Sequence, residues 1–339
     1  MNRYLVIFSL AIVSVLSSCT HKDLCLTHRD HAHKYHINVI ADYRQDWEEF
    51  YGDVDWRNSW PSDYLPYEDL IPALPSGLRV VNNTDNLGSN IHNIQTEGGV
   101  INLYEGLNDL LFYNNDTEYI VFSRTDHGVT TRATTRTRTR STFTRSKYSG
   151  EEEETMTPPD VLYANYFEDV NVERSPVPMD LEVTLQPLVF TYKVRYEFKE
   201  GLEYVSLARG ALSGMARSVL LSNGETSEEA ATLLFDCEIT DFGVRAFVNS
   251  FGIPAFPNVN YPTRGDGKNA LTLELMLKSG KMVTFDYDVS DQITKQPHGG
   301  VIVIKDISIK PEDGIHSSGA FDVDVNEWGP YEDVILPLM

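Results

Sequence analysis

The chain has 339 residues, 41% of them hydrophobic, and a formal net charge of -22 from 28 Lys and Arg against 50 Asp and Glu. This length allows two domains of ordinary size, each with its own core. The acidic balance repels phosphate backbones, so we expect no nucleic-acid partner. With only 3 cysteines, the fold must depend on hydrophobic packing rather than on disulfides.

The N-terminus predicts export and lipidation. Arg3 precedes a short apolar stretch that ends at Leu16. A membrane-spanning helix needs about 20 apolar residues, so this stretch is instead typical of a secretory signal. The following Ser17, Ser18 and Cys19 complete a bacterial lipobox, in which the cysteine thiol carries a diacylglyceryl group and the freed amine receives a further chain such as palmitate.

Several acyl chains together hold a protein firmly in a lipid leaflet. We therefore predict a signal peptide over residues 1–18, lipidation at Cys19, and a polar tether over 19–35. The expected location is the outer membrane, with the body of the protein at the cell surface.

Strand patterns follow the tether. Residues 35–43, 76–86 and 98–106 are β-rich; the second segment runs into an Asn/Asp turn, and two glycines open the third. Leu110–Tyr113 and Tyr119–Phe122 are apolar and aromatic, and an Asn/Asp segment joins them. Because such residues tolerate turn geometry, these two segments predict a β-hairpin.

An unusual segment, "TTRATTRTRTRSTFTRSK", covers residues 130–147. Strict alternation puts arginines on one side of an extended chain and threonines on the other. Unpaired charges are costly to bury, so we predict a solvated loop or an exposed edge. The arginines concerned are Arg132, Arg136, Arg138, Arg140 and Arg145.

The second half is also rich in strands. "KSGK" at 278–281 predicts a tight hairpin turn in which Gly280 supplies a positive φ. Residues 226–235 are the single helix-like patch, although "TLLFDCEI" at 232–239 overlaps it and reads as a strand. Pro176 and Pro178 predict a linker. Short strands with regular turns predict an all-β protein with two tandem β-sandwich domains, at 36–175 and 176–339.

No catalytic motif is present. Ser213 precedes Gly214, but Ala211 stands where a nucleophile elbow requires glycine. Phosphate-binding and dinucleotide-binding loops are missing, and paired carboxylates carry little weight in so acidic a chain. We predict a non-enzymatic protein without a cofactor.

Two patterns resemble metal sites, but neither predicts one. The tether histidines have no rigid frame (His28, His31, His33, His36). Asp322, Asp324 and Asn326 follow calcium-loop spacing, but Glu327 occupies the position that needs glycine.

Three tryptophans lie close together in the sequence, at Trp47, Trp56 and Trp60. Exposed indoles stack on sugar faces, whereas buried ones pack over a sandwich end or a domain seam. The sequence leaves both interpretations open.

The lipobox, the segments "LLFYNNDTEYIVF" and "PPDVLYANYF", and above all "ALSGMARSVLL" at 211–221 resemble the fimbrillin-like lipoproteins of gut and oral bacteria. The similarity is nearest to fimbrial anchor subunits, in a branch of unknown function. It implies two transthyretin-like sandwiches and an anchoring or accessory role in a fimbria-like assembly, with neighbouring subunits bound by strand addition. It also implies cleavage after an arginine of the 130–147 segment as one interpretation of that segment. The alternative function is a surface glycan-binding lipoprotein that uses the tryptophan region or contacts a host surface.

Overall fold

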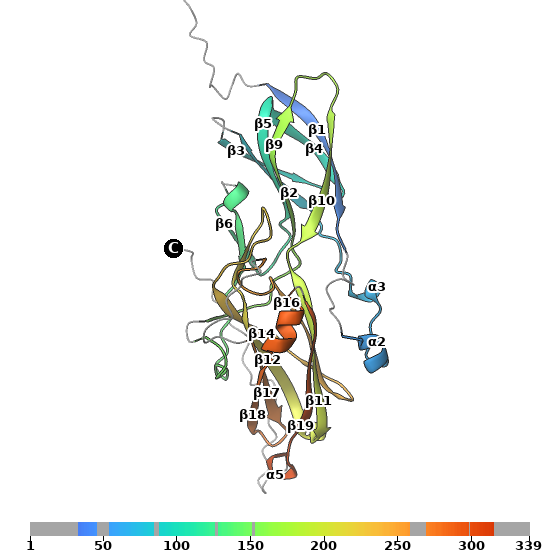
Figure 1. Ribbon diagram of the computed structural model, residues 1–339, viewed down its shortest axis with the longest axis vertical. Helices are drawn as coiled ribbons and strands as arrows, with labels where there is room; N and C mark the ends of the chain where they lie inside the picture. Colours follow the sequence, from blue (N-terminus) through green and yellow to red (C-terminus); the bar gives the residue numbers. More distant parts are fainter. Residues whose placement is uncertain are drawn as a thin grey trace, which may run out of the picture.

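The computed structural model describes residues 33–45, 54–84, 88–125, 128–150, 153–257, 269–297 and 299–314. Two β-sandwiches lie end to end along the longest axis (Figure 1). The predicted all-β class with tandem sandwiches is confirmed. The predicted signal peptide, Cys19, most of the tether and Trp47 fall outside the described residues. No helix within these residues is long and apolar enough to cross a membrane.

The upper sandwich contains the first strands. In one sheet, β1 (Lys34–Tyr43) pairs antiparallel with β4 (Gly98–Tyr104) and parallel with β10 (Met179–Pro187). The facing arm continues this sheet in the order β9 (Tyr163–Val172), β5 (Gly106–Asn114), β2 (Leu78–Thr84) and β3 (Gly88–Ile94). β9 joins β10 through Gln186 and Pro187, so the seven strands form one folded sheet. Inward residues of both arms, such as Ile37, Val80, Ile101 and Phe112, form the core.

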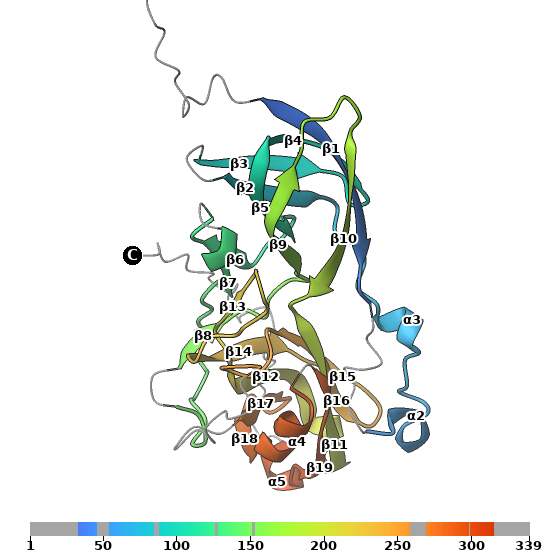
Figure 2. The same ribbon diagram turned by 45° about the horizontal axis from the view of Figure 1, so that its top comes forward.

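The lower sandwich has two sheets. The first has the order β15 (Glu238–Ile239), β16 (Gly243–Ser250), β11 (Phe190–Glu200) and β19 (Gly300–Ser308). The second has the order β18 (Met282–Asp288), β17 (Ala270–Leu277), β12 (Val205–Ala216), β14 (Ala230–Asp236) and β8 (Glu154–Met156). The short helix α4 (Ser290–Lys295) joins β18 to β19, the 3-10 turn η4 (Leu202–Tyr204) precedes β12, and α5 (Pro311–Gly314) follows β19 at the foot of the molecule (Figure 2).

A small third sheet joins the two sandwiches. It contains β6 (Ile120–Ser123), β7 (Arg132–Thr135) and β13 (Ser218–Leu220), with the 3-10 turn η3 (Gly128–Thr130) between the first two. Its apolar side chains pack with those of β5 and with the segment that leads into β11. We call this cluster the waist core (Val81, Leu111, Tyr113, Ile120, Ala133, Leu162, Ala164, Leu188, Val189, Ala216, Val219, Leu221, Phe251). Because it draws residues from both sandwiches, the two halves share one buried interface.

The predicted hairpin at residues 110–122 is wrong. β5 pairs with β2 and β9, whereas β6 pairs with β7. The Asp160 carboxylate accepts the backbone N–H groups of Glu118, Tyr119 and Ile120 at 2.6–3.3 Å. These bonds hold the chain as it leaves one sheet for another, so the Asn/Asp segment is a crossing rather than a hairpin turn.

The helix-like interpretation of residues 226–235 is also wrong, and the overlapping strand prediction at 232–239 is closer, because Ala230–Asp236 forms β14. Ala231, Leu233 and Phe235 point into the lower core, and β12 supplies the hydrogen-bonding partner.

The predicted turn at 278–281 is confirmed. Gly280 has a φ of 80°, and Leu277 donates its N–H to the Lys281 carbonyl at 2.9 Å.

The chain changes sandwiches away from the predicted linker. Pro176 and Pro178 lie in the exposed connection between β9 and β10, and both of these strands belong to the upper sandwich. β8 comes before this connection in sequence, yet it pairs with β14 of the lower sandwich. The crossing itself is made by Leu188 and Val189, which are buried in the waist core.

Candidate functional site

A strap from the upper half covers the lower sandwich. Residues 54–66 follow β1 and carry α2 (Trp56–Ser59), and α3 (Tyr67–Leu70) comes directly after them. The Asp55 side chain caps α2 by accepting the Asn58 N–H at 3.2 Å. The strap lies beside β11 and β16 at the edge of the molecule (Figure 2). It therefore ties the first connection of the upper sandwich to the lower one.

β11 offers the strap a charged surface. Tyr192, Val194 and Tyr196 point into the lower core, so by strand alternation Lys193 and Arg195 point to the opposite face. Both cations are almost fully covered, with side-chain exposures of 0% and 7%. A buried cation needs an ionic partner, and the strap supplies one.

That partner is Asp63, whose side chain is 3% exposed. Its carboxylate lies 2.8 Å from Lys193 Nζ, 2.6 Å from Arg195 Nη1 and 3.1 Å from Arg245 Nη1. Burial raises the pKa of Asp63, but hydrogen bonds from Lys193, Arg195 and Arg245 outweigh it and leave this pKa below its ordinary value. Burial lowers the pKa of Lys193 to about 8, and the contact with Asp63 offsets only part of that shift.

The tryptophans of the strap differ in their exposure. Trp56 is 5% exposed, and Lys193 Nζ lies 3.7 Å from the centre of its ring. Tyr64 packs edge-on against the same indole. Trp56 is thus a packing residue, as the second interpretation of the cluster expects. Trp60 is half-buried near Arg195 and Lys305, and it keeps part of its ring accessible.

The arginine segment is not the solvated loop that its composition predicts. Arg140 is buried, and its Nη1 donates to Glu274 Oε2 at 2.9 Å while its Nη2 donates to the Phe235 carbonyl at 3.1 Å. Arg138 donates to the Leu234 carbonyl at 2.8 Å and pairs with Asp236. The outward face of β14 and β17 therefore supplies partners that offset the desolvation cost of these buried cations. Of the five arginines singled out by the sequence, Arg145 is exposed, although it donates to the Gly150 and Glu153 carbonyls.

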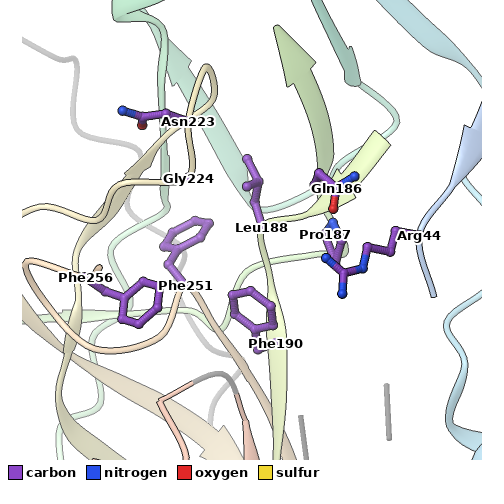
Figure 3. Close-up of a pocket in the computed structure, with 9 residues that line it drawn as sticks. All are labelled: Arg44, Gln186, Pro187, Leu188, Phe190, Asn223, Gly224, Phe251 and Phe256. Atoms are coloured by element: carbon purple, nitrogen blue, oxygen red, sulfur yellow. The ribbon is translucent and has the colours of Figure 1, made fainter. Parts of the chain in front are cut away.

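A cavity of about 200 Å³ lies at the waist (Figure 3). Its aromatic side chains come from β11 and from the segment after β16, and its polar groups come from the ends of β1 and β10 and from the turn after β13. It is lined by Arg44, Gln186, Pro187, Leu188, Phe190, Asn223, Gly224, Phe251 and Phe256. Such a cavity suits an apolar side chain or the apolar face of a ring. Its lining provides no nucleophile paired with a base.

The residues considered for chemistry have structural roles. Ser213 is fully buried in β12, and its Oγ accepts a hydrogen bond from Thr232 at 3.0 Å. Glu153 accepts the Gly214 N–H, also at 3.0 Å. In the described part of the chain, no three His, Cys, Asp or Glu side chains converge as metal ligands. The tether histidines before residue 33 and the calcium-like loop at 322–328 lie outside that part.

The sequence alone does not reveal the Asp63 cluster. The alternation in "TYKVRYEF" does place Lys193 and Arg195 on one face of a strand, opposite three core residues. It gives no sign of their partner, because Asp63 is one of many acidic residues and lies 130 positions from Lys193. The waist cavity was missed for the same reason, since its lining comes from four separate segments.

Comparison with known proteins now adds to this geometry. Residues 68–236 match the family "Domain of unknown function (DUF5119)". The chain is 23% identical over 304 residues to a Bacteroides ovatus protein named "Putative fimbrium anchoring subunit Fim4B", with 81% of this chain and 88% of that protein covered. The crystal structure of "a putative adhesin from Bacteroides ovatus" superposes with a TM-score of 0.57 at 20% identity, covering 89% of this chain and 98% of the other. That structure supports the tandem fold.

Proposed function

Because this chain carries a DUF5119 domain and is a relative of the fimbrial anchor-like proteins, we propose that it is a lipid-anchored subunit of a surface fimbria. It acts as an anchoring or accessory component with an adhesive role, and not as an enzyme. The observation that carries the proposal is the similarity to the fimbrium anchoring protein across most of both chains. The lipobox at Cys19 agrees with it, because an anchor needs an attachment to the membrane.

The shape of the molecule suits this role. β1 begins at Lys34, at the end of the upper sandwich that is farthest from α5 (Figure 1). A lipid on Cys19 would therefore place the upper sandwich next to the membrane and direct the lower sandwich outward. The strap and the waist core make the two halves one unit, which favours the transmission of force from a fibre to the membrane.

Assembly with other fimbrial subunits is part of the proposal, with strand addition as its mode. An open sheet edge gives affinity through its backbone groups and gives register through alternate side chains. In the described part of the chain, β18 is an edge strand of seven residues that pairs with β17 alone.

Metabolic labelling and copurification test the proposal together. Cells expressing the natural chain or the Cys19→Ser variant are grown with an alkyne-tagged palmitate analogue, and the chain is then purified after mild crosslinking. We expect label and fimbrial subunits with the natural chain. With Cys19→Ser we expect no label, together with release of the chain and its fibres into the medium.

Two results would count against this function. A labelled chain that never copurifies a fimbrial subunit would remove the assembly role. Specific retention on a glycan array, lost on Trp60→Ala with folding intact, would instead favour the glycan-binding alternative.

A further inference from the structure

The edge of β19 is closed by side chains rather than by a strand. β19 pairs with β11 on one side and stands last in its sheet. A nine-residue edge strand presents a row of backbone N–H and C=O groups to any extended chain that approaches it. On the open side of β19, α4 supplies Gln292, and the residue that caps its C-terminus supplies a second glutamine, Gln296.

The side-chain amide of each glutamine forms hydrogen bonds with both the N–H and the C=O of one β19 residue. Gln296 Oε1 accepts the Val301 N–H at 2.8 Å, and Gln296 Nε2 donates to the Val301 carbonyl at 3.1 Å. Gln292 does the same for Val303, at 2.9 and 3.0 Å. Reciprocal bonds on alternate residues are the pattern that an antiparallel neighbour makes with an edge strand. Two glutamines four residues apart on one side of a helical turn thus reach two strand residues that are two positions apart and point the same way.

The rest of the molecule fixes this arrangement. Ile293, between the two glutamines, is fully buried in the lower core, and the Gln296 carbonyl accepts the Tyr192 hydroxyl at 2.8 Å. Gln296 itself is only 5% exposed. A methyl group at Gly300 would overlap Gln296 Oε1, so glycine at this position leaves the room that the side-chain amide needs.

The far half of β19 is also unsuited to pairing. Lys305 and Asp306 are exposed, and Asp306 has a φ of 60° where the register with β11 shifts. Charged side chains and bulges are ways in which natural edge strands avoid unwanted partners. Together with the glutamines, they leave little of the β19 edge open.

We infer that α4, through Gln292 and Gln296, is a guard that occupies the main-chain binding sites of Val301 and Val303, and that once these bonds are lost and α4 leaves the edge, β19 pairs with β19 of a second copy of this chain. Antiparallel pairing about a two-fold axis through Ile302 would bring Val301 of each copy opposite Val303 of the other. Those are the two residues whose backbone groups the guard covers, so the interface would be self-complementary. The inference concerns the purified chain and does not depend on the fimbrial role.

Amide hydrogen exchange of the chain from Thr20 onward tests the guard, residue by residue. Gln296→Leu should speed exchange at Val301, and Gln292→Leu should speed it at Val303, each by about tenfold, the factor expected for one lost hydrogen bond. Ile302 and Ile304, whose N–H groups turn toward β11, should keep their protection. Unchanged exchange at Val301 and Val303 in both variants would overturn the guard.

Sedimentation velocity tests the second copy. In Gln292→Glu/Gln296→Glu, each carboxylate can still accept the valine N–H but repels the β19 carbonyl that the amide bound, so we expect α4 to lose its hold on the edge and a concentration-dependent dimer to form. Lys295→Glu, on the exposed side of α4, changes the net charge by the same -2 and should leave the chain monomeric. A double variant that stays monomeric while Val301 and Val303 exchange rapidly would refute pairing at β19. Gln292→Leu/Gln296→Leu, which removes the acceptors as well, repeats the measurement if the charged variant does not fold or keeps Val301 and Val303 protected.

Discussion

Asp63, Lys193 and Arg195 form the most concentrated group of buried charge on the lower sandwich. Removing ions from water costs several kcal/mol each, and close, hydrogen-bonded opposite charges repay much of it. Asp63 offsets part of this desolvation cost for two buried cations and also contacts Arg245. The cluster thus fixes where the strap sits more than it adds net stability.

The first prediction concerns Asp63→Asn. This change leaves Lys193 buried without a carboxylate and leaves Arg195 with Glu197 alone, so we expect the free energy of unfolding at pH 7 to fall by about 3–5 kcal/mol. The pKa of Asp63 is lowered in the folded protein, so its stabilisation is present above the ordinary value of 3.8 and is lost as the pH falls through the folded pKa. The difference between natural and variant chains in urea unfolding should therefore shrink below about pH 4.

Glu312→Gln provides the control for this measurement. Glu312 pairs with Lys310 at 3.6 Å, and both side chains are 73% exposed. Such surface pairs contribute about 0–1 kcal/mol. A pH-independent difference for Asp63→Asn, or one as small as that of the control, would contradict the role assigned to Asp63.

At the scale of elements, the arginine segment shows how a polar stretch becomes part of a fold. β7 joins it to the third sheet, and Arg138 donates its N–H to the Thr155 carbonyl of β8. Arg140 then reaches across the outward face of β14 and β12, where it contacts the Gly210 carbonyl, to Glu274 on β17. The segment is held first by backbone pairing and then by two guanidinium groups, and its exposed residues, Arg145 among them, begin at Thr139.

The second prediction is that limited trypsin digestion cuts the folded chain after Arg145 or Lys147 before it cuts after Arg138 or Arg140. Glu274→Gln removes the charge that Arg140 contacts, which should weaken the local structure by about 3 kcal/mol. Cleavage after Arg138 and Arg140 should then accelerate by more than tenfold, measured by mass spectrometry of the fragments.

Asp236→Asn is the matched control, because Asp236 pairs with Arg138 but its side chain is 57% exposed. It should change the cleavage rate little. Rapid cutting after Arg140 in the natural chain would show that the burial of this side chain does not protect the segment. It would also support maturation by cleavage within the segment.

At the scale of the whole molecule, three features couple the two sandwiches: the buried crossing at Leu188 and Val189, the waist core and the strap. Domains joined by a small polar contact move independently, whereas a large apolar contact couples them. The waist core is apolar and is built from both halves. We therefore expect the chain to behave as one rod rather than as two linked bodies.

The third prediction follows from this coupling. Calorimetry of the natural chain should give one thermal transition. Trp56→Ala removes the buried indole that packs against Lys193. We expect this change to destabilise the contact between the strap and the lower sandwich by about 3–5 kcal/mol. We expect the lower sandwich of this variant to unfold first, as a separate transition, while the upper core stays intact.

Ser59→Ala, at an exposed position of the same helix, should keep the single transition. Two transitions already present in the natural chain would show that the waist core does not couple the halves.

Much of the fold could be predicted from local sequence. Strand-rich composition and turn residues indicated β2 and β4, and alternation indicated β11, in which Val194 and Tyr196 face the lower core. Local pattern was ambiguous at β14, where residues from Ala231 to Phe235 are buried on both faces and show no period of two, so that a helix and a strand both fit. It also failed at β5 and β6, where a turn-like segment crosses between sheets.

The sequence by itself determined that this is an acidic, strand-built chain whose N-terminus predicts export and lipidation, because composition, strand periodicity and the lipobox are local properties. Only the tertiary structure decided which strands pair, where the chain passes between the sandwiches, and which charges are buried. Asp63 contacts Lys193, and Gln296 contacts Val301, because packing brings distant or differently folded segments together. Such partnerships depend on the three-dimensional arrangement of backbone groups, which no short stretch of residues encodes.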